Sequence, residues 1–301
     1  MEEPRSAAVR TAAFQWLQRH WESTGETIPR AALELGFPFE GERVQLLGPQ
    51  GIFKPRQIAH YPLSITTTTK SPYSDSFEPG TDFLLYSYRG NDPDFHENRR
   101  LRDAMHDRVP LTYFFSTIPG RYLTIWPVYV VGDNPSRLQF TVAADEPAQL
   151  KYERDDSDEQ TRRRYATRLV RQRMHQRSFR DRVLQAYQER CSICRLHHSN
   201  LLDAAHIIAD SEEMGEPLVS NGLSLCKIHH AAFDNRYFGI RPNYEIVVQP
   251  KIMEERDGPM LKHGLQEIHG SRIFLPPQSR NRPDPERLHT RFEEFAKAAN
   301  L

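Results

Sequence analysis

The chain contains three cysteines, and all of them lie within one short region of the sequence. Cys191 and Cys194 form a C-x-x-C pair, and Cys226 and His229 form a C-x-x-H pair. Three thiols cannot all pair with one another as disulfides, whereas these two spacings are typical of structural zinc sites. The pattern therefore predicts one tetrahedral zinc ion held by these four residues. His197 or His198 could replace one of the ligands, and the alternative is three buried thiols without a metal.

The length and charge pattern limit the class of protein. A chain of 301 residues can form two domains. It has no apolar run of about 18 residues, and its first residues lack the apolar core of a signal peptide, which predicts a soluble, cytoplasmic protein. The formal net charge is zero, but Thr161–Arg190 carries ten arginines against Asp181 and Glu189. Such a segment indicates a polyanionic partner, most often phosphate, or else a solvated helix face.

The predicted fold class is α+β, beginning with a first domain over residues 1–150. Apolar residues at helical spacing over 7–22 predict one helix, and "IPRAALELG" predicts a second that ends at Gly36. From about 43 to 144, short β-type runs alternate with Gly, Pro, Asn and Asp, with one helix over 96–106 between them. This pattern predicts a β-barrel domain with flanking helices.

A linker and a second domain are expected to follow. The acidic stretch 151–160 has no regular apolar pattern and is interpreted as the linker, so the second domain spans 161–301. Within it, "YEIVVQP" and "SRIFLPP" are predicted strands. The segment "DPERLHTRFEEFAKA" is a predicted terminal helix with Asp284 as N-cap and Pro285 at the first helical position.

Residues around the predicted zinc ligands resemble the HNH endonucleases, whose ββα-metal fold is often stapled by two such pairs. His206 in "LLDAAHI" matches the first histidine of that motif, Asn221 in "NGLSLC" matches the asparagine, and His230 matches the final histidine. The resemblance covers about residues 178–240. It implies a zinc-stapled ββα-metal domain that hydrolyses phosphodiester bonds in DNA.

The resemblance also implies roles for the three residues. Phosphodiester hydrolysis needs a base that deprotonates water, and His206 is the expected base. His230 is the expected ligand of a divalent cation, Mg²⁺ or Mn²⁺, and Asn221 is expected to fix the loop beside the base.

One position departs from the family. Many HNH enzymes have an acidic or histidine cation ligand immediately before the base, and this chain has Ala205 there. Asp203, on the same face of the strand, is expected to substitute. Asp234 lies one helical turn after His230 and either completes the cation site or braces the helix.

Part of the first domain is similar to the SET- and RING-associated (SRA) domain, a PUA-like barrel that reads modified cytosine. The points of similarity lie within about residues 60–130: a Tyr-x-Asp segment, a Tyr-x-Gly strand end, and the residues Asn98, Leu101 and Pro110. That family flips the base and holds it between aromatic rings, with a carboxylate on its polar edge. Carried over, Tyr73 and Tyr88 stack on the base and Asp75 accepts its hydrogen bond, unless the two tyrosines are simply core aromatics. Arg89, with Arg171 and Arg177 of the Arg-rich helix, is expected to contact DNA.

Together the two resemblances imply a modification-dependent restriction endonuclease of the McrA-like type. Such an enzyme would bind double-stranded DNA carrying 5-methylcytosine or a related base and cut it nearby, as a homodimer. Two alternatives stay open. In one, the first domain reads another modification or DNA structure; in the other, the protein is a zinc-stabilised DNA-binding module that does not cut.

Overall fold

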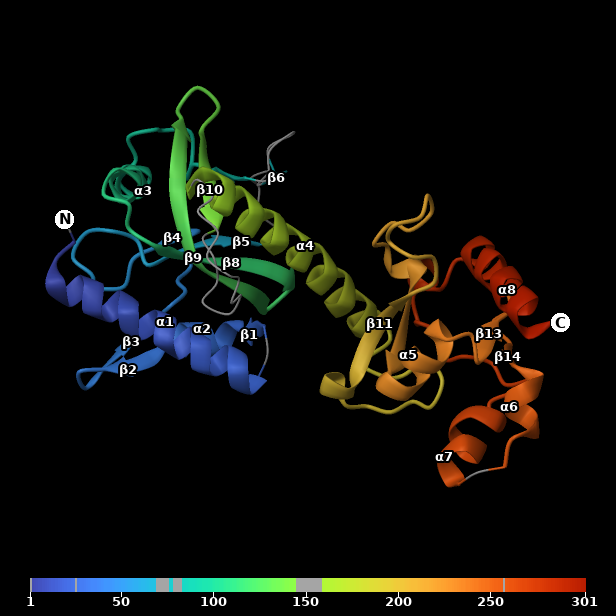
Figure 1. The fold of residues 1–301 in the computed structure, drawn as a ribbon. Helices are drawn as coiled ribbons and strands as arrows, with labels where there is room; N and C mark the ends of the chain where they lie inside the picture. The colour runs from blue at the N-terminus through green and yellow to red at the C-terminus, as the bar shows by residue number, and fades with distance from the viewer. Residues whose placement is uncertain (1, 25, 69–75, 78–82, 145–158, 257) are drawn as a thin grey trace. The chain divides into compact units, whose positions relative to one another are not determined.

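The computed structural model describes residues 2–24, 26–68, 76–77, 83–144, 159–256 and 258–301 (Figure 1). The chain divides into two compact units, Met1–Met174 and His175–Leu301. No described helix is both long enough and apolar enough to span a membrane.

The first unit is built on one curled, eight-stranded sheet (Figure 1). Its strands are β1 (Thr27–Pro29), β4 (Ile52–Phe53), β5 (Ser64–Thr67), β6 (Ser76–Phe77), β7 (Leu84–Ser87), β8 (Leu111–Ile118), β9 (Arg121–Asn134) and β10 (Gln139–Ala144). The order is β4-β5-β8-β9-β10-β7-β6, with β1 also paired to β9. Only β5 and β8 are parallel among these pairs. The sheet ends at β4 and β6 within the described residues, so it forms a half-barrel where a β-barrel domain was predicted.

Both faces of this sheet are buried, because consecutive residues of β8 enter different cores. Tyr113 joins one apolar cluster and Phe114, its neighbour, joins another. The Phe114 cluster includes α1 (Pro4–Thr24), in which Val9, Ala13 and Leu17 are fully buried at four-residue spacing.

Two further helices of this unit confirm the sequence pattern. Helix α2 (Arg30–Leu35) ends at Gly36, whose φ of 66° and whose close approach to the Val44 carbonyl exclude a Cβ atom. Helix α3 (His96–His106) has the predicted bounds and packs Leu101 into the Tyr113 cluster. The hairpin of β2 (Phe37–Phe39) and β3 (Glu42–Val44) completes the unit.

The long helix α4 (Glu159–Ala186) contributes to both units. Val170 and Met174 join the Tyr113 cluster of the first unit, whereas Phe179 and Val183 join the core of the second. The division between units therefore falls inside this helix, after Met174. Residues 151–158 of the predicted linker lie outside the described residues. The helix continues across the division because each half has its own apolar core to cover.

The second unit centres on two hairpins and their helices. The first hairpin pairs β11 (Leu202–His206) with β12 (Gly222–Cys226) and leads into α5 (Lys227–Asp234); the second pairs β13 (Phe238–Ile240) with β14 (Ile246–Val248). The remaining elements are η1 (Ser199–Leu201), η2 (Val219–Asn221), α6 (Pro250–Glu254), α7 (Pro259–Leu261), a π-turn over Lys262–Gln266, η4 (Ser279–Asn281) and α8 (Pro285–Ala299).

The predicted terminal helix is confirmed as α8, where Asp284 accepts hydrogen bonds from the Glu286 and Arg287 amides and Pro285 follows it. The predicted strand at 271–277 was wrong. Only one bridge forms there, between Glu245 and Arg272. The Ile273 amide still donates to the Tyr244 carbonyl, but the Phe274 amide donates to the Ser192 carbonyl instead.

Candidate active site and metal centre

Four side chains of the second unit form a compact ligand cluster. The ligand atoms of Cys191, Cys194, Cys226 and His229 all lie within 4.8 Å of one another. The Cys226 sulfur lies 3.1 Å and the Cys191 sulfur 3.5 Å from Nδ1 of His229. Tetrahedral zinc with Zn–S bonds of about 2.3 Å and Zn–N bonds of about 2.0 Å requires separations of this size. The cluster can therefore hold a metal ion, and His197 and His198 lie outside it, exposed.

His229 is oriented for ligation by its other nitrogen. Nε2 lies 2.8 Å from the Gly264 carbonyl, so it donates there and leaves Nδ1 to face the sulfurs. Burial lowers the pKa of His229, but the Cys194 and Cys226 side chains outweigh this effect and raise it to about 10. A divalent cation would displace that proton, as ligation of thiolate and imidazole normally does.

His206 and Asn221 lie where β11 ends and β12 begins, and His230 lies on α5 beside Asp203 of β11. Asn221 is fully buried just before β12; its Oδ1 accepts from the Ile208 amide at 3.0 Å. Its Nδ2 donates to the carbonyls of Ile208 and Glu216, at 3.0 and 3.1 Å. Asn221 therefore ties both ends of the loop that follows His206.

His206 ends β11 and is partly buried under α4. Its ring stacks on Phe179, with centroids 4.0 Å apart and planes 14° apart. Burial lowers the pKa of His206 and nearby His230 lowers it further, against an opposite effect of Asp210. Phe179 can approach this closely because Gly222 faces it; a Cβ at Gly222 would lie 2.9 Å from the Phe179 ring.

His230 lies between two carboxylates. Its Nδ1 is 3.4 Å from Asp203 Oδ2, and its Nε2 is 3.4 Å from Asp234 Oδ2. Asp203 also accepts from Lys227 Nζ at 2.6 Å and lies 3.7 Å from Arg180 Nε. Burial opposes ionisation of Asp203, but Lys227 and His230 hold its pKa below the ordinary range.

Only two of the expected cation ligands converge. Two ligands of a six-coordinate cation at about 2.1 Å lie about 3 Å apart, and the Asp203 Oδ2 to His230 Nδ1 separation of 3.4 Å fits such a pair. Asp234 contacts the opposite nitrogen of the ring and so cannot share that cation with Asp203. Within the described residues, the Cys₃His cluster is the one group of three or more ligands that gathers around a point.

Ala205 is fully buried and pairs with Leu223, which is also fully buried. Both belong to the apolar core of the unit. A charged ligand at 205 would therefore have to leave water for that core, whereas Asp203 is only partly buried.

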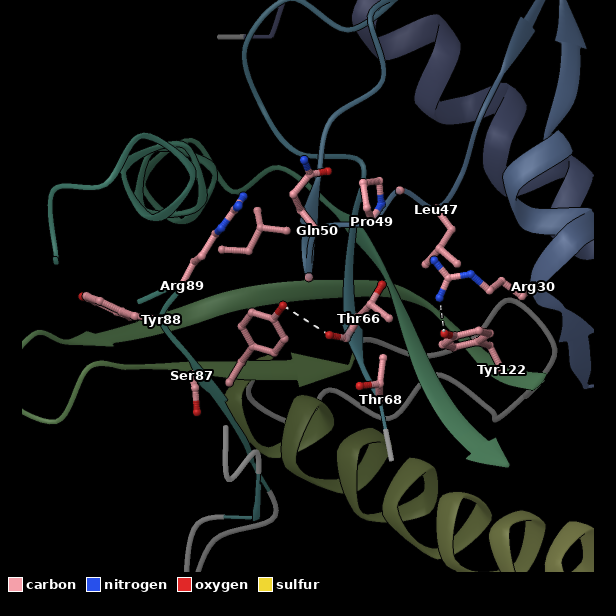
Figure 2. Close-up of a pocket in the computed structure, with 14 residues that line it drawn as sticks. Arg30, Leu47, Pro49, Gln50, Thr66, Thr68, Ser87, Tyr88, Arg89 and Tyr122 are labelled. Carbon is pink, nitrogen blue, oxygen red and sulfur yellow. Dashed lines mark hydrogen bonds between the residues drawn. The ribbon is translucent and has the colours of Figure 1, made fainter. Parts of the chain in front are cut away.

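A cavity of about 280 Å³ opens in the first unit beside β4, β5 and β7. Figure 2 shows Gln50, Thr66 and Thr68 around it, with the Tyr88 ring directed away from them. Tyr86 also lines the cavity, and its hydroxyl donates to the Thr66 carbonyl at 3.4 Å. The hydroxyl oxygen of Thr66 is buried without a partner among the described residues.

Of the three predicted base-pocket residues, the structure describes Tyr88, which lines the cavity. Tyr73 and Asp75 lie outside the described residues. Tyr88 is only 1% exposed and packs its ring on Phe140, while its hydroxyl hydrogen-bonds to Asp133 and accepts from Arg102 at 3.2 Å.

The predicted DNA-contacting arginines also differ in their surroundings. Arg89 lines the cavity and pairs with Glu97. Arg171 is exposed on α4, and Arg177 lies 3.7 Å from Asp181 on the same helix.

The family comparison bears on the second unit. Residues 191–241 match the family model described as HNH endonuclease. The chain carries an HNH endonuclease domain. Its enzymatic class is therefore DNA endonuclease.

Two solved structures are similar to the chain at low identity. One is titled "Modification dependent TagI restriction endonuclease", with 14% identity, a TM-score of 0.30, and coverage of 78% of this chain and 82% of that one. The other is "Structure of the Type IV phosphorothioation-dependent restriction endonuclease ScoMcrA", with 16% identity, a TM-score of 0.21, and coverage of 56% and 52%. The chain thus spans about half of the second protein. No curated protein matches the chain.

Some contacts of the HNH domain were not predictable from the motif. The stacking of Phe179 on His206 joins residues from separate elements, and the only hint in the sequence was Gly222 directly after Asn221. Lys227 was visible beside Cys226, but its pairing with Asp203 depends on how the hairpin places α5.

Proposed function

We propose that the protein is a modification-dependent endonuclease, which binds DNA carrying 5-methylcytosine or a related modified cytosine and cuts it nearby. The observation that carries this proposal is the separate folded unit with a base-sized cavity in a chain that has an HNH endonuclease domain. A nuclease site alone does not select modified DNA, so selection requires a second site.

In the proposed reaction His206 is the general base. Its depressed pKa keeps the imidazole neutral near pH 7, so it can accept a proton from water as the oxygen attacks the phosphorus. The stacked Phe179 ring and the Asn221 hydrogen bonds hold the base and its loop in place. Cleavage leaves a 5′-phosphate and a 3′-hydroxyl.

His230 Nδ1 and Asp203 are the proposed ligands of a catalytic Mg²⁺ or Mn²⁺. The bound cation would neutralise charge on the phosphate and on the leaving 3′ oxygen. Asp234 orients the His230 ring through Nε2, as carboxylates commonly do for ligating histidines. Lys227 balances the Asp203 charge and is the group that a cation would displace.

The Cys₃His cluster is proposed to bind structural zinc. Cys226 ends β12 and His229 lies in the first turn of α5, so the ion would link the hairpin to the helix that carries His230. One active site per chain and two strands to cut suggest a homodimer.

The cavity of the first unit is the proposed binding site for the flipped base. A volume of about 280 Å³ lies just below the range for drug-sized ligands and suits a single nucleobase. Tyr86 offers a ring edge, and Gln50 offers both a donor and an acceptor for the polar edge of the base. Tyr73 and Asp75 remain the proposed stacking and accepting residues, and the buried Tyr88 lines the cavity.

A variant that fills this cavity tests whether the first unit binds the modified base there. A Cβ at Gly51 would lie 2.9 Å from the Tyr86 hydroxyl, so Gly51→Leu places a side chain in the space proposed for the base. Base stacking contributes about 1–3 kcal/mol, so the ratio of cleavage rates on methylated and unmethylated duplexes should fall about 10-fold to 100-fold. The measurement is single-turnover cleavage of matched duplexes.

Two further variants control for folding. Gln50→Ala removes a polar lining group without filling the cavity, and it should lower the same ratio in a folded protein. Gly258→Leu adds the same bulk where no atom lies within 4 Å of the new Cβ, and it should leave the ratio unchanged. An unaltered ratio in both Gly51→Leu and Gln50→Ala would place the base elsewhere.

A further inference from the structure

A second polar groove lies within the HNH unit itself, apart from the cluster around His206 and His230. It has a volume of about 620 Å³ and lies between the last turns of α4, the η2 turn and the segment 277–281. Its lining includes two arginines and four carboxamides, namely Arg182, Gln185, Gln188, Gln278, Arg280 and Asn281. No carboxylate is among the described residues that line it, so the groove is positively charged.

The groove is organised by hydrogen bonds of its own side chains. Arg182 is partly buried and donates through Nη2 to the Pro217 carbonyl at 3.0 Å and through Nε to the Ser178 carbonyl at 3.2 Å. Gln278 Oε1 accepts from Arg280 Nε at 3.3 Å and from Asn281 Nδ2 at 3.4 Å. The polar groups are therefore held in a defined arrangement on both walls.

The groove lies close to the proposed base along the same helix. Phe179 stacks on His206, and Arg182 and Gln185 follow it on α4 by three and six residues. At a rise of 1.5 Å per residue these positions are about 5 and 9 Å further along the helix axis. DNA rises about 3.4 Å per base pair, so these axial distances correspond to about one to three base pairs from His206.

The chemistry of the lining suits DNA. Guanidinium groups bind phosphate oxygens, and the carboxamides of Gln and Asn pair with base edges. A small anion would need only the arginines, whereas four carboxamides in a groove of about 620 Å³ match a nucleotide chain with its phosphates and bases.

We propose that this groove binds the DNA segment about one to three nucleotides from the scissile phosphate, with Arg182 and Arg280 on the backbone. The carboxamides then contact bases or sugars of the same segment. The inference rests on the endonuclease activity and is independent of which modification the first unit reads.

Arg280→Ala tests whether the groove binds DNA. Arg280 is exposed, and its loss leaves the hydrogen bonds of Arg182 to the Pro217 and Ser178 carbonyls intact. Binding of a fluorescent duplex is measured by anisotropy across a salt series, on modified and unmodified DNA. Loss of one phosphate contact should weaken binding about tenfold and reduce the salt slope by about 0.9, equally on both duplexes.

Arg256→Ala is the matched control, since it removes an exposed arginine that does not line the groove. It should bind like the parent protein. A parent-like affinity and salt slope for Arg280→Ala would overturn the inference. If the parent shows no preference for modified DNA, the reader proposal fails while the groove test still gives its answer, because phosphate contacts do not depend on the modification.

Discussion

The His206→Ala variant is expected to lose DNA cleavage by about 10²-fold to 10⁴-fold while keeping its metal and its affinity for DNA. The ring of His206 contributes the proposed proton acceptor, and no other side chain stacks on Phe179 in its place among the described residues. The measurement is the single-turnover rate at saturating DNA with Mg²⁺ or Mn²⁺, together with zinc content and anisotropy.

The pH profile of the parent gives a second readout of the same residue. Because burial and His230 lower the pKa of His206, the base loses its proton at a lower pH than a free histidine. The rate should therefore reach half its maximum below the ordinary histidine pKa of about 6.5, and it should fall as pH decreases further. The His206→Ala variant should lack this titration.

His198→Ala is the control for this prediction, because His198 is an exposed histidine of the same unit outside the cluster of four. It should cut at the parent rate and keep its zinc. Cleavage by His206→Ala at the parent rate would show that His206 is not the base.

Removal of the proposed zinc is expected to unfold the HNH domain. Structural zinc contributes on the order of 10 kcal/mol in small zinc-bound domains, and Cys226→Ser removes a ligand that joins β12 to α5. Zinc content should fall from one ion per chain to none, cleavage should stop, and the unfolding transition of His175–Leu301 should be lost. The first unit has its own cores and should keep its transition.

Titration of the free thiols measures the loss of zinc directly, because every cysteine of the chain belongs to the cluster. With zinc bound the thiols should react slowly, and after chelation all three should react. His197→Ala and His198→Ala should behave like the parent in this assay. Rapid reaction of the metal-loaded protein, or full stability after chelation, would contradict a structural zinc site.

Local patterns in the sequence predicted the parts of the molecule that depend on short-range chemistry. The two ligand pairs predicted the Cys₃His cluster, and Asp284 with Pro285 predicted the start of α8. The bounds of α3 were predicted because the sequence pattern of a helix is set by residues close together in the chain.

Features that depend on long-range packing were not predictable in this way. Tyr88 lines the cavity, but the bonds of its hydroxyl to Asp133 and Arg102 could not be read from the sequence. Ala205 departs from the family pattern of an acidic or histidine residue before the base, and its pairing with buried Leu223 places it in the apolar core. The strand expected over 271–277 did not form, because the amide of Phe274 donates to the Ser192 carbonyl, which is distant in the chain.

Cleavage of three otherwise identical plasmids tests the central proposal most directly. The plasmids are unmodified, methylated at cytosine, or hydroxymethylated at cytosine, and each is incubated with the protein and Mg²⁺ or Mn²⁺. The account predicts cutting of at least one modified plasmid at least tenfold faster than the unmodified one. Equal rates on all three plasmids would contradict it.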